Sequence, residues 1–197
     1  MELNKAKNIA IDICYRLQPF CTKLNIAGSI RRKKPEVKDI EICAVPIQTP
    51  VQEQDLFGAI TQNLQIDLGF INTVNALGKI EKGSPAGRYC KILLPEGIAL
   101  DLFIPDPDDY YRQFAIRTGS ADYSFKVIAA GWRKIGWVGS DIGLRLEKDC
   151  IETKQTDGKS KWVCARNKNN KPPVWSSEEE FFKWINVPFI APELRVL

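Results

Sequence analysis

Two acidic residues stand one residue apart inside an apolar run, in the stretch "AGSIRRKKPEVKDIEICAVP" at residues 27–46. In a β-strand, side chains two residues apart point to the same side, so Asp39 and Glu41 would lie about 7 Å apart along the chain while Ile40 and Ile42 face a core. Two carboxylates this close raise each other's pKa unless a cation lies between them. Mg²⁺ prefers such oxygen ligands, together with substrate phosphates and water. The pair predicts a divalent-metal site; a half-exposed strand with a solvated face has the same pattern and is the alternative.

Small and cationic residues come just before this pair. Gly28 permits close approach of the backbone to a ligand, and Ser29 offers a hydroxyl and an amide. Arg31 and Arg32 supply fixed positive charge nearby. Together these groups are suited to binding a polyphosphate, and the alternative is a solvated turn.

A third acid, Asp101, lies in the apolar stretch "GIALDLFIP". A buried carboxylate without a partner is costly, so Asp101 needs a cation beside it. Three carboxylates on neighbouring strands would hold two metal ions, one lowering the pKa of an attacking hydroxyl and one holding a triphosphate and its leaving group. The alternative is an ion pair between Asp101 and a lysine or arginine of the core.

Composition excludes several classes of site. The chain has 197 residues, of which 44% are apolar, and this is enough to bury a core. Its net charge of +4 is too small to identify a nucleic-acid-binding protein. No histidine is present, which excludes Ser-His-Asp and Cys-His catalysis. The six cysteines form no C-x-x-C pair and are predicted to be reduced, mostly buried thiols. No apolar run reaches the length of a membrane span, so we expect a soluble, cytoplasmic protein without a membrane partner.

Periodicity predicts the elements that carry these residues. Apolar residues recur at helical spacing from residue 6 to residue 17, before Pro19. Strands are expected at 23–27 and 38–45, a helix at about 51–64, and a loop at 77–89. The stretch 89–105 reads as two strands joined by a turn at residues 95–97. After residue 105 we expect two helices broken at 118–120, a hairpin turning at Asp157-Gly158 and a last helix with a capping box from Ser177 to Glu180.

These motifs, in this order, resemble a known family. A small residue with Gly-Ser, then nine residues, then Asp-apolar-acid-apolar is the signature of the nucleotidyltransferase superfamily. The stretch "GSIRRKKPEVKDIEI" looks like its family X DNA polymerase branch. The similarity continues through "KIEKG", "ALDLF", "RTGSADYS" and "EEEFFKWINVPFIAPELR", over nearly the whole chain. It implies an α+β fold with an α/β-like palm built on a mixed sheet (residues 1–105) and a smaller α+β thumb lobe (residues 106–197).

The resemblance also implies roles for residues. Asp39, Glu41 and Asp101 would form a catalytic triad that binds two Mg²⁺ ions, or Mn²⁺. The nucleotide would be bound by Gly28, Ser29, Arg32, Arg117, Thr118, Gly119, Ser120 and Ser124. Cations that would neutralise DNA phosphates are Lys79, Lys82, Arg88, Arg133 and Lys134.

Some positions depart from the family pattern. Glu41 replaces the usual second aspartate, and Ala99 stands where the best-known members have an arginine near the primer end. Ile116 and Arg117 replace two aromatic residues, and Ser124 replaces an asparagine. The change at residue 117 predicts weak discrimination against ribonucleotides.

We therefore expect a monomeric palm-plus-thumb DNA polymerase without a lyase domain. It would add dNMP from a dNTP to the 3′-hydroxyl of a DNA primer–template and release pyrophosphate, in DNA repair or gap filling, with Asp101 accepting the proton. The alternatives are a template-independent nucleotidyltransferase acting on RNA or a small molecule, and a catalytically degenerate nucleic-acid-binding protein.

Overall fold

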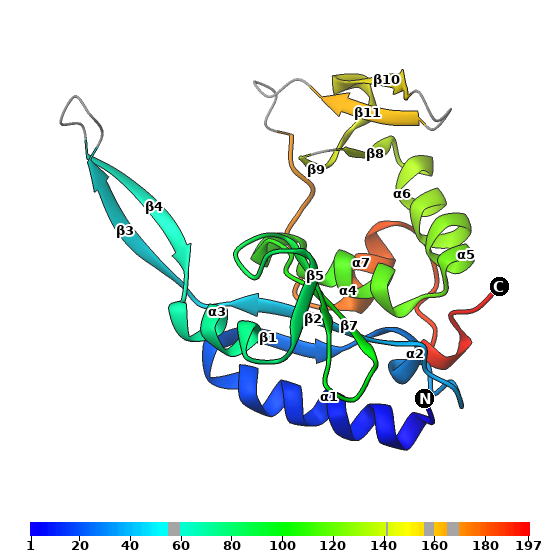
Figure 1. Cartoon of the computed structure of the whole chain (residues 1–197). Coiled ribbons are helices and arrows are strands. Elements are labelled where there is room, and N and C mark those ends of the chain that lie inside the picture. The colour runs from blue at the N-terminus through cyan, green and yellow to red at the C-terminus, as the bar shows by residue number, and fades with distance from the viewer. Residues whose placement is uncertain (55–59, 141, 156–159, 165–169) are drawn as a thin grey trace.

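A mixed five-stranded β-sheet forms the centre of the first half of the molecule (Figure 1). The computed structural model describes residues 1–54, 60–140, 142–155, 160–164 and 170–197. The strand order is β1-β2-β7-β6-β5, with β2 and β7 parallel and the other neighbours antiparallel. The strands are β1 (Cys21–Ile26), β2 (Asp39–Pro46), β5 (Lys79–Gly83), β6 (Tyr89–Leu93) and β7 (Ala99–Phe103).

Helices cover one face of this sheet. Helix α1 (Leu3–Leu17), followed by the turn η1 (Gln18–Phe20), and helix α3 (Leu68–Asn75) supply its apolar cover. The sheet contributes alternate residues of β2 and β7 to the same core, all fully buried: Ile40, Ile42, Leu100 and Leu102. This alternation leaves the intervening residues of β2 and β7 to the opposite face.

Helix α4 (Tyr110–Thr118) packs on that opposite face. It follows the turn η2 (Pro107–Asp109) and buries Tyr110 and Phe114 against Cys43 of β2 and Phe103 of β7. The amide of Asn25 donates to the Tyr110 hydroxyl at 2.7 Å, which ties α4 to β1. Acidic residues of β2 and β7 therefore share a face with α4.

The rest of the chain builds a second apolar core and a second sheet. The core contains the buried rings of Trp132, Trp175, Phe181 and Phe182. The sheet has the order β10-β11-β8-β9. Its strands are β8 (Trp137–Ser140), β9 (Gly143–Leu146), β10 (Cys150–Lys154) and β11 (Ser160–Cys164). The remaining helical elements are α2 (Gly28–Arg31), α5 (Ala121–Tyr123), the π-helical η3 (Ser124–Ala129), α6 (Ala130–Lys134), η4 (Glu147–Asp149), α7 (Glu178–Trp184) and η5 (Pro192–Leu194).

The helix expected at 51–64 is wrong. Two antiparallel strands, β3 (Gln48–Gln54) and β4 (Ile60–Ile66), pair from Gln48↔Ile66 onward and extend away from the large sheet (Figure 1). Glutamine, glutamate and leucine favour helix, but Leu64 is exposed, and the residues of this stretch whose burial is described form no buried apolar stripe that would support a helix. Cross-strand backbone hydrogen bonds outweigh that weak propensity.

The loop expected at 77–89 contains a strand. Residues 79–83 form β5, which pairs with β6 with an irregularity between Ile80 and Lys82. Gly83 has φ +75°, and a Cβ there would lie 2.0 Å from the carbonyl oxygen of Tyr89. The glycines that suggested a loop thus permit a close approach of two strands.

Other expected elements are confirmed. Strands β6 and β7 both lie within the stretch 89–105. The predicted hairpin is formed by β10 and β11, and its predicted turn at Asp157-Gly158 lies outside the described residues. Ser177 caps α7 by accepting from the Glu180 amide at 3.2 Å. Ser120 caps α5 in the same way. Among the described residues, no helix has both the length and the apolar character required to cross a membrane. The division into lobes at 1–105 and 106–197 stays a prediction.

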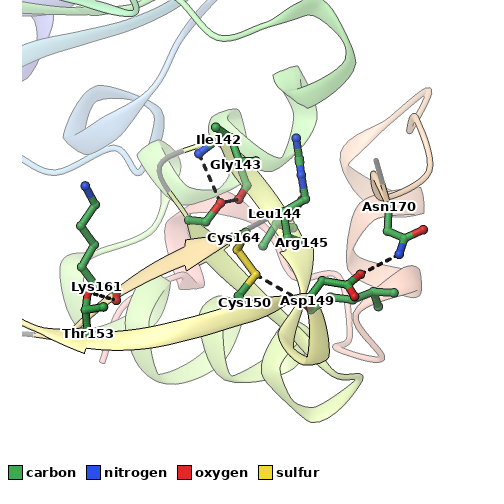
Figure 2. Close-up of a disulfide and its surroundings, with 12 residues drawn as sticks. Ile142, Gly143, Leu144, Arg145, Asp149, Cys150, Thr153, Lys161, Cys164 and Asn170 are labelled. Carbon is green, nitrogen blue, oxygen red and sulfur yellow. Dashed lines mark hydrogen bonds between the residues drawn. A yellow bond between two sulfur atoms is a disulfide. The ribbon is translucent and has the colours of Figure 1, made fainter. Parts of the chain in front are cut away.

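The expectation of reduced cysteines is wrong for one pair. Cys150 and Cys164 face each other across β10 and β11 and form a disulfide (Figure 2). Their spacing in the sequence does not reveal this, because the pairing depends on the register of the hairpin. The other four cysteines are free, and Cys21, Cys43 and Cys90 are buried as expected.

Candidate active site

The parallel pairing of β2 and β7 brings two of the predicted carboxylates side by side. Glu41 is the direct register partner of Asp101, and Asp39 is that of Ala99. Neighbouring strands are about 4.8 Å apart, and residues in register on parallel strands point to the same face. All three acids are half-buried and lie on the face opposite the Ile40 and Ile42 side chains.

The charges of these acids act on one another. Burial, and then the charges of Asp39 and Asp101, raise the pKa of Glu41 to about 7, against the opposing effect of the guanidinium groups of Arg32 and Arg117. A cation among the carboxylates would relieve this repulsion. The donor set is all oxygen, which fits a hard divalent ion. Within the described residues, however, the acids do not converge into a group of three that could hold a metal ion.

Gly28 lies against Glu41. It has φ +61°, and a Cβ at this position would lie 1.7 Å from Oε2 of Glu41. Glycine is therefore required here for two reasons: the backbone is in the left-handed conformation, and the Glu41 side chain leaves no room for a Cβ atom. The sequence predicted close approach of a ligand at Gly28, whereas the structure places the Glu41 carboxylate there.

Two of the predicted phosphate-binding groups have unmet hydrogen-bonding capacity. The hydroxyl of Ser29 and Nε of Arg32 are buried without a hydrogen-bond partner among the described residues. Arg32 also donates through Nη1 to the carbonyl oxygens of Thr118 and Gly119, at 2.5 and 3.0 Å. It thus holds the helix α2 turn to the end of α4.

The predicted sugar-binding segment is hydrogen-bonded within the protein. The buried Thr118 hydroxyl accepts from Arg31 at 2.7 Å, and Ser120 accepts from the Tyr123 amide at 3.1 Å. The Ser124 hydroxyl donates to the carbonyl oxygen of Ile116 at 2.7 Å. These hydroxyls stabilise the junction of α4, α5 and η3.

A cleft of about 1050 Å³ opens over the carboxylate face. Its lining includes Glu41, Tyr89, Asp101, Arg117, Arg145 and Lys171. The guanidinium of Arg117 stacks over the Phe103 ring at 4.0 Å. The cleft thus joins acids of the large sheet to cations from the second half of the chain.

The predicted DNA-binding cations are all exposed and lie in different places. Lys82 and Arg88 line the cleft, where Arg88 pairs with Asp106 at 3.4 Å. Arg133 and Lys134 end α6, and the Arg133 guanidinium lies 5.7 Å from the Trp162 ring. Lys79 begins β5 and is not part of the cleft lining.

A solved structure has a similar fold. The chain is similar to polymerase beta of Leishmania infantum, solved as a ternary P/T complex, with a TM-score of 0.63 and 16% sequence identity over 99% of this chain and 76% of that chain. The chain has a polymerase beta-like fold. No protein-family model matches the sequence, and no curated protein matches it.

In this polymerase beta-like fold, the predicted α+β class with a mixed sheet is confirmed. Sequence reasoning missed Tyr89, whose hydroxyl donates to Oδ1 of Asp101 at 2.6 Å. The sequence also predicted Arg31 as a positive charge for phosphate binding, whereas in the structure its guanidinium donates hydrogen bonds to Glu178 and Thr118. The hydrogen bonds of Tyr89 and of Arg31 join residues that are distant in the sequence, so no local sequence pattern predicts them.

Proposed function

We propose that this protein is a nucleotidyltransferase that adds dNMP from a dNTP to the 3′-hydroxyl of DNA and releases pyrophosphate. The observation that carries the proposal is the register of β2 and β7, which sets Glu41 beside Asp101 in a cleft lined by cations. The polymerase beta-like fold supports the same reaction class.

Asp39, Glu41 and Asp101 are the groups that would hold Mg²⁺, or Mn²⁺ in its place. Two such ions lower the pKa of an attacking hydroxyl and neutralise charge on a triphosphate when they are bound. The raised pKa of Glu41 reflects burial and the neighbouring acids, and it marks this cluster as one that favours a cation or a proton.

The reaction forms one bond between the 3′-oxygen and the α-phosphorus and breaks the bond from that phosphorus to the pyrophosphate oxygen. The proton of the 3′-hydroxyl must leave, and no histidine is present to accept it. Asp101 takes this role in the proposal, directly or through a water molecule, because its carboxylate lines the cleft.

Triphosphate binding falls to groups around α2 and the end of α4. The unpartnered hydroxyl of Ser29 can donate to a phosphate oxygen, and the missing side chain of Gly28 makes room for the Glu41 carboxylate beside it. Arg32 and Arg117 supply positive charge that already acts on Glu41. The hydroxyls of Thr118, Ser120 and Ser124 enter the proposal as supports of the sugar-side wall, with Gly119 among them.

The partner in this proposal is a DNA primer–template, bound by a protein monomer. Lys82 and Arg88 at the cleft, Lys79 on β5, and Arg133 and Lys134 on α6 neutralise its backbone phosphates. Gap filling during DNA repair is the role we propose for such an enzyme, with residues 1–105 as palm and 106–197 as thumb.

Primer extension tests this function directly. A labelled primer is incubated with the protein and Mg²⁺, with and without a template strand, and with each dNTP and NTP singly. We expect template-dependent addition of one matched deoxynucleotide. Addition that ignores the template, or that occurs with RNA or a small acceptor alone, would assign a different nucleotidyltransferase activity. DNA binding without addition in either Mg²⁺ or Mn²⁺ would contradict the enzyme.

A further inference from the structure

Tyr89 reaches from the neighbouring strand to the Asp101 carboxylate. In the pairing of β6 with β7, Tyr89 stands opposite Phe103, so its hydroxyl crosses diagonally to Asp101. The phenol donates to Oδ1 at 2.6 Å, a distance typical of a charge-assisted O–H···O⁻ bond. Within the part of the chain that the structure describes, Oδ2 of Asp101 accepts no side-chain hydrogen bond.

The ring of Tyr89 is held in place by its neighbours. Its centroid lies 5.4 Å from that of Phe103, and the Arg117 guanidinium lies over the Phe103 ring at 4.0 Å. The three side chains form a stack from α4 across β7 to β6. A donor fixed in this way restrains the carboxylate that it binds.

The charge of the donor matters as much as its position. Lys91 is the direct register partner of Asp101 on β6, yet no ion pair joins these two among the described residues. A lysine bonded to Asp101 would compete with a metal ion for the carboxylate charge. The neutral phenol orients the same group and leaves its negative charge uncompensated.

We propose that Tyr89 is a positioning residue for Asp101: by holding Oδ1 it leaves the other carboxylate oxygen for a divalent cation and for the proton of the 3′-hydroxyl. This inference rests on the proposed function. Hydrogen-bond partners of metal ligands characteristically fix the orientation of the ligand and its affinity for the ion. Tyr89 contacts neither substrate in this account, and it acts through Asp101.

The test is Tyr89→Phe, which keeps the ring and removes only the hydroxyl. Tyr110→Phe is the matched control, because it removes the hydroxyl of a buried tyrosine that accepts from Asn25 at 2.7 Å on the same face of the sheet. Mn²⁺ binding to each protein is measured by electron paramagnetic resonance with DNA present and no dNTP. The rate constant kcat and the KM for dNTP are then measured on the same DNA.

For Tyr89→Phe we expect Mn²⁺ affinity to fall by about tenfold and kcat to fall by about tenfold, while KM for dNTP changes by less than about twofold. Tyr110→Phe should keep wild-type values for all three. Unchanged Mn²⁺ affinity and kcat in folded Tyr89→Phe would overturn the role of Tyr89, and so would equal losses in both variants. If wild-type protein neither binds Mn²⁺ nor adds a nucleotide, the proposed function fails and takes the role of Tyr89 with it.

Discussion

Arg31 and Glu178 form a bidentate ion pair that joins the last residue of α2 to the first residue of α7. Nη1 of Arg31 donates to Oε1 at 3.0 Å, and Nη2 donates to Oε2 at 2.5 Å. The same carboxylate accepts from the fully buried Arg195 at 2.7 Å, and Arg31 also donates to Thr118. This network fixes the residues beside Ser29 against the end of the chain.

Removing one partner of this pair should destabilise the protein. Arg31→Ala leaves the buried Glu178 carboxylate paired with Arg195 alone. We expect the free energy of unfolding to fall by about 3 kcal/mol, which is the lower end of the range for removing one partner of a buried ion pair. Lys126→Ala is the control, because its pair with Asp122 is exposed and should contribute less than about 1 kcal/mol. Urea unfolding measures both. Equal losses would show that the Arg31 pair is no stronger than a surface pair.

The same carboxylate should make stability depend on pH. Burial alone would raise the pKa of Glu178, but hydrogen bonds and charge from Arg31 and Arg195 outweigh it and lower the pKa below the ordinary 4.5. The unfolded chain therefore takes up this proton at higher pH than the folded chain. The contribution is complete above about pH 4.5 and is lost as pH falls further.

Glu178→Gln removes the group that titrates. We expect this variant to be less stable than wild type at pH 7 and to lose less further stability between pH 5 and pH 3. Urea unfolding at several pH values across that range provides the measurement. Parallel curves for the two proteins would show that Glu178 is not a source of the pH dependence.

Gly28 offers a sharp test of the contact with Glu41. Gly28→Ala should cost roughly 3 kcal/mol or more, since a left-handed backbone and a clash with the carboxylate act together. Gly97 has φ +76° with nothing near its missing Cβ, so Gly97→Ala reports the backbone cost alone, about 1–2 kcal/mol. Thermal and urea unfolding compare the two. Indistinguishable losses would contradict the close approach of Glu41.

How much of the site follows from sequence depends on how far apart its members lie in the chain. The alternation of Asp39 and Glu41 with buried isoleucines is local, so period two predicted one shared face correctly. Predicting the pairing of Glu41 with Asp101 requires the order of the strands in the sheet. The family resemblance implied that order, and the spacing of residues in the sequence could not provide it. The hydrogen bond from Tyr89 needs the register of β6 against β7 as well, and nothing in its neighbourhood predicts it.

The errors have the same origin. The stretch 51–64 contains good helix formers, but its described residues pair with one another as two antiparallel strands, from Val51↔Asn63 to Gln54↔Ile60. Cys150 and Cys164 are fourteen residues apart, and only the hairpin register sets them opposite each other. Local propensity is a weak guide wherever pairing decides the structure.

Arg117 should influence the choice of sugar. Its guanidinium is stacked on Phe103 in the cleft, where its N–H groups can donate to a ribose 2′-oxygen that an aromatic side chain would exclude. We expect weak discrimination against ribonucleotides by wild type and stronger discrimination by Arg117→Phe. The measurement is the ratio of kcat/KM for a deoxynucleotide to kcat/KM for the matching ribonucleotide. Arg88→Ala, at the exposed edge of the cleft, is the control and should leave this ratio unchanged. Strong discrimination by wild type that Arg117→Phe does not alter would rule out this role.

The most direct test of the whole account is the rate of dNMP addition to a gapped DNA by wild type and by Asp101→Ala in Mg²⁺. The substitution removes one of three mutually repelling carboxylates, so circular dichroism and unfolding should show an intact fold. We predict template-directed addition by the wild-type protein and none detectable by Asp101→Ala. Near-wild-type addition by folded Asp101→Ala would contradict the carboxylate mechanism.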